Sequence, residues 1–180
     1  MIVSIHQPNF LPWMPFFEKI KKSDIFIILR HCDFEKNNFQ NRFIYEGVWN
    51  TMSVKSKGKK IVDKRYANPY YDWVKIKKRL FNKDLSIFDE CISESLFETN
   101  SNIIQKCCSV LNIKTEIVLD YKTDLLRTDR LLDLCQNYGA TTYLCGPSGK
   151  NYLETDKFTD NSIKIEHFSY TRKEHFFEAV

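Results

Sequence analysis

The sequence predicts an α/β protein with a Rossmann-like, mostly parallel sheet and an irregular helical middle section. Three observations support this fold class. Short apolar runs, typical of strands that are buried on both faces of a sheet, recur along the chain. Amphipathic helical patterns separate several of these runs. The beginning of the chain contains a strand, a helix and a second strand in succession, which is the pattern of a βαβ unit with parallel strands.

The opening βαβ unit is defined by its hydrophobic spacing. Residues 3–5 are predicted to form one buried strand, and residues 24–29 are predicted to form a second one. Between them, aromatic and aliphatic residues repeat at helical spacing, which predicts an amphipathic helix over residues 13–22. Pro15 falls in the first turn of this helix, where proline is tolerated.

The rest of the chain continues this alternation after a less regular middle. Two short strands are expected to meet at a turn formed by Glu46 and Gly47. Gly139 is expected to cap the end of a helix, because glycine readily adopts the left-handed conformation found there. In chain order we predict strands 43–45 and 49–54, helices 70–80 and 85–111, strand 115–119, helix 124–138, and strands 141–145 and 163–168.

Length and charge limit the class of protein. The 180 residues suit a single domain spanning residues 1–180. The formal charge of +4 is weak, and Lys and Arg lie among Asp and Glu, so nucleic acid is not an expected partner. No apolar run is long enough to span a membrane, and the first residues do not have the pattern of a signal peptide. We therefore expect a cytoplasmic protein.

Cysteine usage points to the same compartment. The sequence has six cysteines, none of them in a Cys-x-x-Cys pair, and no histidine at zinc-finger spacing. Buried, reduced thiols are the simplest account, and no metal site is expected.

The first candidate site is the loop that follows the first predicted strand. His6, Gln7 and Asn9 place polar side chains there, and Pro8 and Pro12 prevent a regular backbone ladder. Loops that a rigid strand holds in place often carry function. The alternative is that His6 is a core histidine satisfied by the backbone, and the sequence favours neither interpretation.

The second candidate site, residues 30–42, follows the second predicted strand. Open α/β sheets bind ligands at the carboxyl ends of their strands. This segment is dense in groups suited to hydrogen bonding and anion binding, among them Lys36, Gln40, Asn41 and Arg42. A solvated loop is the alternative interpretation.

The third candidate site, residues 146–150, follows the fourth predicted buried strand. Gly146 and Gly149 flank Ser148, and Lys150 comes next. Glycines allow a backbone to approach an anion closely, so the segment is suited to phosphate. The spacing differs from that of a Walker A loop, and the motif alone is a weak signal.

Several motifs resemble those of one family and occur in the same order over nearly the whole chain. They are Ile5-His6-Gln7-Pro8-Asn9-Phe10-Leu11-Pro12-Trp13, Phe39-Gln40-Asn41-Arg42, Thr128-Asp129-Arg130-Leu131, and Tyr143-Leu144-Cys145-Gly146-Pro147-Ser148-Gly149-Lys150 with Tyr152-Leu153. Through these motifs the chain resembles the WbqC-like family. It departs from the family pattern at Pro15, Arg30 and Asp33, where members often carry Gly, an acidic residue and Gln.

The resemblance implies a role in making or decorating a surface polysaccharide of the O-antigen type. The activity it implies is the transfer of glycine or a similar amino acid onto a nucleotide-linked amino sugar, with formation of an amide. The implied partners are that nucleotide sugar and an amino-acid or acyl donor. ATP would be needed if the amino acid is activated on the protein, and assembly into a homo-oligomer stays open.

Amide formation needs a base near the amine, donors for a developing oxyanion, and cations for phosphate. His6, Gln7 and Asn41 are the predicted catalytic residues, with His6 as the base or as a phosphate contact. Arg42 and Lys150 are expected to hold phosphate. The predicted substrate-binding residues are Asn9, Trp13, Lys36, Gln40, Arg42, Arg130, Gly146, Ser148, Gly149, Lys150 and Tyr152.

Other activities would use the chain differently. A non-catalytic nucleotide-sugar-binding module that supports a glycosyltransferase complex would use the same loops. A metal-dependent glycosyltransferase is disfavoured, because the sequence has no Asp-x-Asp motif. A nucleophilic Cys145 is also disfavoured, because no histidine follows it at a diagnostic position and members of the family often carry Ser there.

Overall fold

The computed structural model describes residues 1–171 and 174–179, which form two compact units. Unit 1 comprises Met1–His6, Pro15–Leu29 and the described part of Ile113–Arg172. Unit 2 comprises Gln7–Met14, Arg30–Asn112 and the described part of Lys173–Val180. Most of unit 2 is therefore one long segment between two strands of unit 1.

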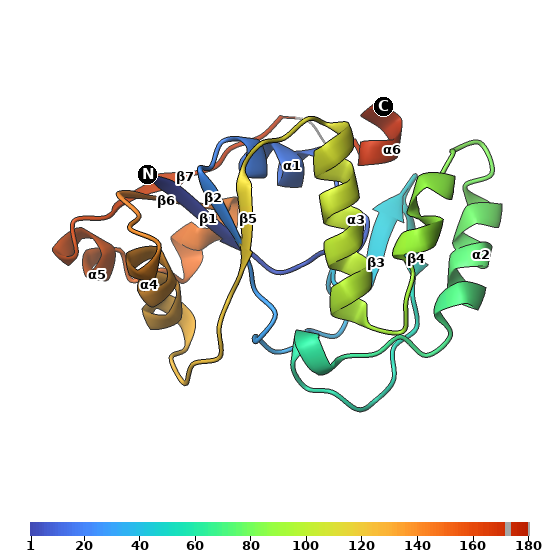
Figure 1. Ribbon diagram of the computed structural model, residues 1–180, viewed down its shortest axis with the longest axis horizontal. Coiled ribbons are helices and arrows are strands. Elements are labelled where there is room, and N and C mark those ends of the chain that lie inside the picture. Colours follow the sequence, from blue (N-terminus) through green and yellow to red (C-terminus); the bar gives the residue numbers. More distant parts are fainter. Residues whose placement is uncertain (172–173, 180) are drawn as a thin grey trace. The chain divides into compact units, whose positions relative to one another are not determined.

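Unit 1 contains a five-stranded parallel sheet in the order β5-β2-β1-β6-β7 (Figure 1). Numbered along unit 1, this order is 3-2-1-4-5, as in a Rossmann sheet. The predicted α/β class with a Rossmann-like parallel sheet is thus confirmed. The elements are β1 (Ile2–His6), α1 (Met14–Lys21), β2 (Ile25–Ile28), β5 (Glu116–Leu119), α4 (Arg127–Asn137), β6 (Thr142–Cys145), η3 (Pro147–Asn151), α5 (Thr155–Asp160) and β7 (Lys164–His167).

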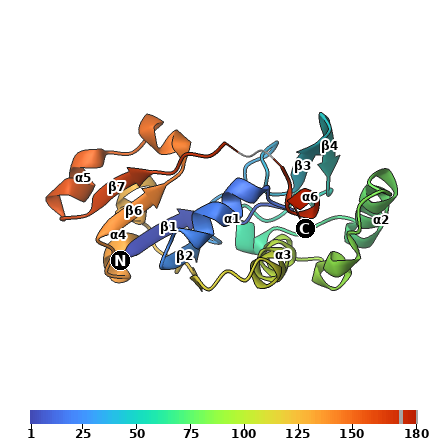
Figure 2. The ribbon, with the colours of Figure 1, turned by 90° about the horizontal axis from the view of Figure 1, so that it is seen from above.

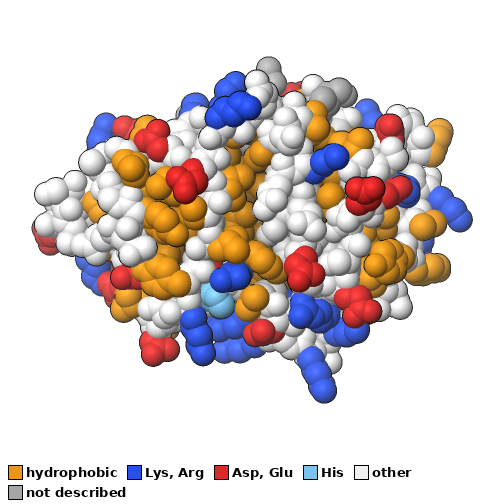
Figure 3. Space-filling model, in the orientation of Figure 1, with side chains coloured by type: hydrophobic (Ala, Val, Ile, Leu, Met, Phe, Trp, Pro, Cys, Tyr) orange, Lys and Arg blue, Asp and Glu red, His pale blue; other side chains and the backbone are white. Residues whose placement is uncertain are grey.

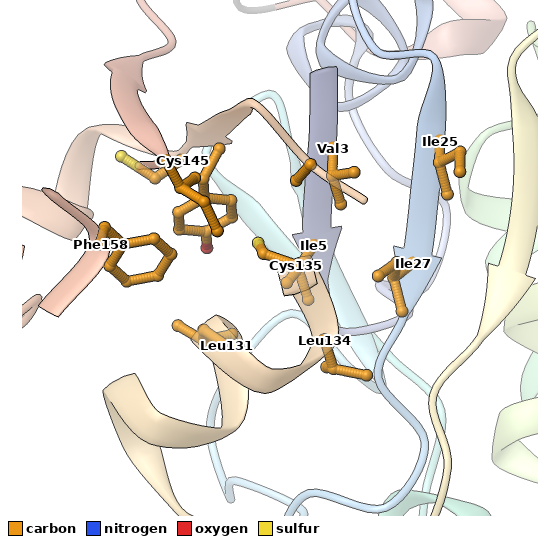
Figure 4. Close-up of a cluster of buried hydrophobic side chains, with 12 residues drawn as sticks. Val3, Ile5, Ile25, Ile27, Leu131, Leu134, Cys135, Cys145 and Phe158 are labelled. Carbon is orange, nitrogen blue, oxygen red and sulfur yellow. The ribbon is translucent and has the colours of Figure 1, made fainter. Parts of the chain in front are cut away.

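Different helices cover the two faces of this sheet. Val3 and Ile5 of β1 point into a buried cluster with Leu134 of α4 (Figure 4). On the other face, Phe26 of β2 meets Phe16 of α1 with 5.4 Å between ring centroids. Figure 2 shows α1 running beside β1 and β2. Because each strand alternates its side chains between the faces, both faces must be apolar, and this explains the continuous apolar runs in the sequence.

The helix predicted over residues 124–138 is shorter at its start. It begins at Arg127 and ends at Asn137, and Gly139 follows with a φ of 64°. That left-handed conformation confirms the predicted glycine cap. Leu131 and Leu134 are buried on its inner face, as their spacing predicts.

Unit 2 begins its regular structure with an antiparallel hairpin. Its strands pair Tyr45 with Val48, and the turn residues Glu46 and Gly47 both have a positive φ, of 48° and 75°. The predicted turn is confirmed, and its geometry is the one that two-residue hairpin loops favour. The elements of unit 2 are β3 (Arg42–Tyr45), β4 (Val48–Thr51), η1 (Ile61–Asp63), α2 (Pro69–Arg79), η2 (Ser86–Cys91), α3 (Leu96–Val110) and α6 (Phe176–Ala179).

The single helix predicted over residues 85–111 is wrong in its middle. The structure has a short 3₁₀ helix, η2, and then a separate α3. Ser95 explains the break, because its side chain accepts a hydrogen bond from the backbone N–H of Glu98 and caps the start of α3. A helical period alone does not show where one helix ends and another begins.

No helix within residues 1–171 and 174–179 combines the length and apolar character needed to cross a membrane. On the face drawn in Figure 3, Lys and Arg side chains occur together with Asp and Glu side chains. This mixture agrees with the weak net charge of +4.

Candidate functional site

The parallel sheet of unit 1 has a topological switch point between its central strands, β1 and β6. From β1 the chain continues to β2 on one side, and from β6 it continues to β7 on the other. In such sheets the two connections leave in opposite directions, and ligands bind in the crevice beyond the carboxyl ends of the strands. His6 ends β1, and residues 146–150 follow the end of β6. The fold of unit 1 therefore brings His6 and the loop at residues 146–150 to one edge of the sheet.

The His6 side chain is half-buried and held at the end of β1. Its imidazole meets the ring of Phe16 edge to face, with 5.0 Å between centroids. Its backbone carbonyl accepts a hydrogen bond of 2.9 Å from the N–H of Leu29. These contacts fix the position of the imidazole relative to the sheet, as a base or a phosphate contact would require.

Lys19 of α1 is a buried cation at the same edge. Its side chain is only 4% exposed, and its Nζ donates a hydrogen bond of 3.0 Å to the backbone carbonyl of Ile5. Burial lowers the pKa of this amine to about 8. Lys19 was not among the site residues predicted from the sequence. The available signal was a lysine on the apolar face of a helix, next to Ile20 and three residues after Phe16.

Two lysines act electrostatically on Cys145. Burial raises the pKa of its thiol, and the ammonium groups of Lys19 and Lys150 oppose that rise. Its Sγ lies 3.0 Å from Nδ1 of His167, the residue that pairs with it across β6 and β7. The end of β6 is therefore a place where two lysines favour negative charge.

The two glycines of the loop at residues 146–150 differ in their surroundings. A Cβ added to Gly149 would lie 2.8 Å from Sγ of Cys145, so this glycine is needed for close packing. A Cβ added to Gly146 would meet no atom of the described residues within 4 Å. Open space next to Gly146 allows a ligand to approach the backbone at the switch point. Ser148, Lys150 and Tyr152 are exposed on the same loop and just after it.

Arg130 of α4 is engaged in a buried ion pair. Its guanidinium contacts the carboxylate of Asp120, which follows β5 at the carboxyl edge of the sheet. Both side chains are almost completely buried. The pair anchors the start of α4 to the edge of the sheet and leaves Arg130 a limited surface for a ligand.

Three of the predicted polar residues, Gln7, Gln40 and Asn41, hydrogen-bond within unit 2. The Gln40 side chain is fully buried and donates a hydrogen bond of 2.6 Å to Oε1 of Gln7. The Asn41 amide donates one of 2.8 Å to the backbone carbonyl of Met52. Asn100, which was not among the predicted residues, donates to the carbonyls of Pro8 and Gln40. These amides fix the loop after β1 within unit 2.

The remaining predicted residues of unit 2 lie nearer its surface. The Arg42 guanidinium stacks over the Trp49 indole, 3.8 Å from the ring centroid. Lys36 is exposed, and Asn9 and Trp13 are half-buried. The predicted site residues therefore fall into two groups. His6, Arg130, Gly146, Ser148, Gly149, Lys150 and Tyr152 belong to unit 1, and Gln7, Asn9, Trp13, Lys36, Gln40, Asn41 and Arg42 belong to unit 2.

Fold and site together define a Rossmann-like α/β protein with a positively charged switch point. The chain belongs to the WbqC-like protein family, which matches residues 7–178 and thus runs through both units. It is also similar to the uncharacterized protein Rv1507c of Mycobacterium tuberculosis, with 29% identity over 191 residues, covering 93% of this chain and 82% of that protein. No solved structure matches the chain.

Proposed function

We propose that this protein is an enzyme of surface-polysaccharide biosynthesis that transfers glycine or a similar amino acid onto a nucleotide-linked amino sugar. Membership in the WbqC-like family points to a polysaccharide-related function. The switch point of unit 1 is the site that we assign to the nucleotide-linked sugar.

The observation that carries this proposal is the charge at the end of β6. Lys19 and Lys150 both favour negative charge at Cys145, and open space lies beside Gly146. The diphosphate of a nucleotide sugar is an anion that fits such a position in a Rossmann-like sheet. Because Lys19 is buried, its attraction to a bound phosphate is screened less than that of a surface lysine.

The chemistry assigned to the site is amide formation. The amine nitrogen of the sugar attacks the carbonyl carbon of an activated aminoacyl donor, and the new N–C bond forms. The donor's leaving group departs with the electron pair of its bond to carbon, and the amine proton passes to the imidazole of His6. An aminoacyl phosphate made with ATP, or an aminoacyl ester, is a suitable class of donor.

A non-catalytic nucleotide-sugar-binding module is the alternative function, and one observation favours it. The amides of Gln7, Gln40 and Asn41 already hydrogen-bond within unit 2. Side chains used in this way stabilise the structure and have less capacity to polarise a substrate. The two functions share the binding site and differ in turnover.

A binding and turnover experiment separates the two. The purified protein is mixed with UDP- and dTDP-linked 4-amino sugars, ATP and glycine, singly and together, and its melting temperature and the products are measured. A nucleotide sugar is expected to raise the melting temperature. A product heavier than the sugar by one glycyl residue supports the enzyme, and stabilisation without product supports the binding module. No stabilisation by any nucleotide sugar would contradict both.

Variants test the position of the site. His6→Ala should abolish product formation but retain sugar binding, because the imidazole acts as the base. Lys150→Ala should weaken sugar binding about tenfold, the size expected for one charged contact. Lys164→Ala is the matched control. Lys164 begins β7 and therefore lies at the amino ends of the parallel strands, whereas the proposed site lies at their carboxyl ends. A control variant that weakens binding as much as Lys150→Ala would place the site elsewhere.

A further inference from the structure

Unit 2 has a pocket of its own, which the proposed reaction does not use. Its volume is about 240 Å³, and it is lined by residues from β4 and α2. The lining includes Trp49, Asn50, Asp72, Lys75 and Arg79. The helix residues stand at positions 72, 75, 76 and 79, a spacing that places them on one face of α2.

Two cations give the pocket a preference for anions. Lys75 and Arg79 are exposed, and neither forms an ion pair with a carboxylate among the described residues. Asp72 is the acidic residue of the lining, and its Oδ2 already accepts hydrogen bonds from the backbone N–H and the hydroxyl of Ser53. The lining thus carries a net positive charge, and a bound carboxylate or phosphate would neutralise it.

Asn50 supplies a polar group that lacks a partner. It is 2% exposed and is the buried residue of β4. Its Nδ2 donates a hydrogen bond of 3.1 Å to the carbonyl of Val48, but within the described residues its Oδ1 has no partner. A buried acceptor without a donor is unfavourable, so a ligand with a hydroxyl or N–H group would gain by supplying one.

Trp49 adds an amphipathic surface with a fixed orientation. Its side chain is partly exposed, and the Arg42 guanidinium lies 3.8 Å from its ring centroid. Arg79 donates a hydrogen bond of 3.3 Å to its backbone carbonyl. An indole held in this way offers apolar contact to the carbon atoms of a ligand without a large loss of conformational entropy.

We propose that this pocket binds an acidic monosaccharide, which is a sugar that carries a carboxylate or a phosphate. The acid would pair with Arg79 and Lys75, a hydroxyl would donate to Asn50, and the carbon face of the sugar would contact Trp49. The volume lies below the range typical of drug-sized ligands, which favours one sugar unit. The choice of a sugar over other small hydroxylated acids rests on the proposed function, whereas the preference for an acid does not.

The test is calorimetric titration of the full chain with four probes: glucuronate, glucose 1-phosphate, glucose and inorganic phosphate. Glucuronate carries its negative charge on a carboxylate, and glucose 1-phosphate carries it on a phosphate. At least one of these two acidic sugars should bind. Neither glucose nor phosphate alone should bind as tightly, because glucose lacks the acidic group and phosphate lacks the sugar ring. Binding of phosphate with equal affinity, or binding of none of the probes, would overturn the proposal.

Variants locate the binding. Arg79→Gln should weaken binding of the acidic sugar about tenfold or more, as expected for the loss of a charged hydrogen bond. Lys78→Gln is the matched control, since Lys78 is an exposed cation on α2 outside the pocket. Equal weakening by both variants would show a diffuse charge effect and contradict the proposed site.

One comparison separates this proposal from the proposed function. Arg79→Gln should leave the binding of the nucleotide sugar unchanged, whereas Lys150→Ala should leave the binding of the acidic sugar unchanged. If the unmodified protein binds the acidic sugar but no nucleotide sugar, only the function proposed for unit 1 is contradicted.

Discussion

Both units have apolar interiors, and unit 2 also buries a set of hydrogen-bonded side-chain amides. In unit 1, the strands and α4 share an apolar cluster that includes Val3, Ile27 and Leu134. In unit 2, the fully buried Gln40 side chain donates a hydrogen bond to Gln7, and the fully buried Asn100 side chain donates to the backbone carbonyls of Pro8 and Gln40. An apolar cluster tolerates small changes of shape, whereas a buried amide requires each partner in place. This difference helps to explain why hydrophobic patterns in the sequence predict the elements of unit 1 better than those of unit 2.

The largest expected effect tests the contribution of the apolar cluster in unit 1. Leu134→Ala removes a fully buried side chain from the cluster of unit 1. The free energy of unfolding should fall by about 2–5 kcal/mol, from lost burial and the cavity left behind. Urea denaturation measures it, with Leu126→Ala as the control because Leu126 is 67% exposed. Similar losses in both variants would contradict the assignment of the inner face of α4.

Asn100→Ala tests the contribution of the buried amides in unit 2. The variant removes two donors to the carbonyls of Pro8 and Gln40, and it leaves the Tyr66 hydroxyl without its acceptor. Buried polar groups without partners should lower the free energy of unfolding by about 3 kcal/mol. Asn102→Ala, on the exposed side of the same helix, should change it little. Equal stability of the two variants would contradict a stabilising role of the Asn100 hydrogen bonds in unit 2.

Lys19 links stability to pH in unit 1. Its pKa is about 8 in the folded protein and 10.5 in the unfolded chain, so the unfolded state binds more protons between these values. Stability should therefore rise with pH over this window, by about 3 kcal/mol at most. Lys19→Met should lack this rise, and the difference between the two proteins cancels the titration of other groups. A constant difference from pH 8 to 10.5 would contradict the burial of the amine.

The smallest expected effect concerns the loop at the switch point. Gly149→Ala places a Cβ 2.8 Å from Sγ of Cys145 and should destabilise the protein by about 1–3 kcal/mol. Gly146→Ala is the control, because its φ of −71° is ordinary and the space beside it is open. Adding Cys145→Ala to Gly149→Ala should recover part of the loss. Equal effects at both glycines would show that close packing against Cys145 is not the reason for Gly149.

The sequence predicted the five strands of unit 1 and the helices α1 and α4, because each is a local pattern. It did not predict α5, a helix of only six residues. It also predicted that His6 and the loop at residues 146–150 follow strands, and the parallel sheet then brings them to one edge. The hydrogen bond between Cys145 and His167 was missed, since it depends on the pairing of β6 with β7 across 22 residues. The division of the predicted site residues between two units was missed for the same reason, because it depends on contacts between segments far apart in the chain.

The most direct test of the central claim is to measure the pKa of Lys19 by ¹³C NMR of its side chain, with and without a UDP-linked amino sugar. A Lys19→Arg variant assigns the signal. If the diphosphate binds at the switch point, its negative charge should raise the pKa of Lys19 from about 8 toward its ordinary value of 10.5. A pKa that stays at about 8 in the presence of saturating ligand would contradict a phosphate site at the junction of β1 and β6.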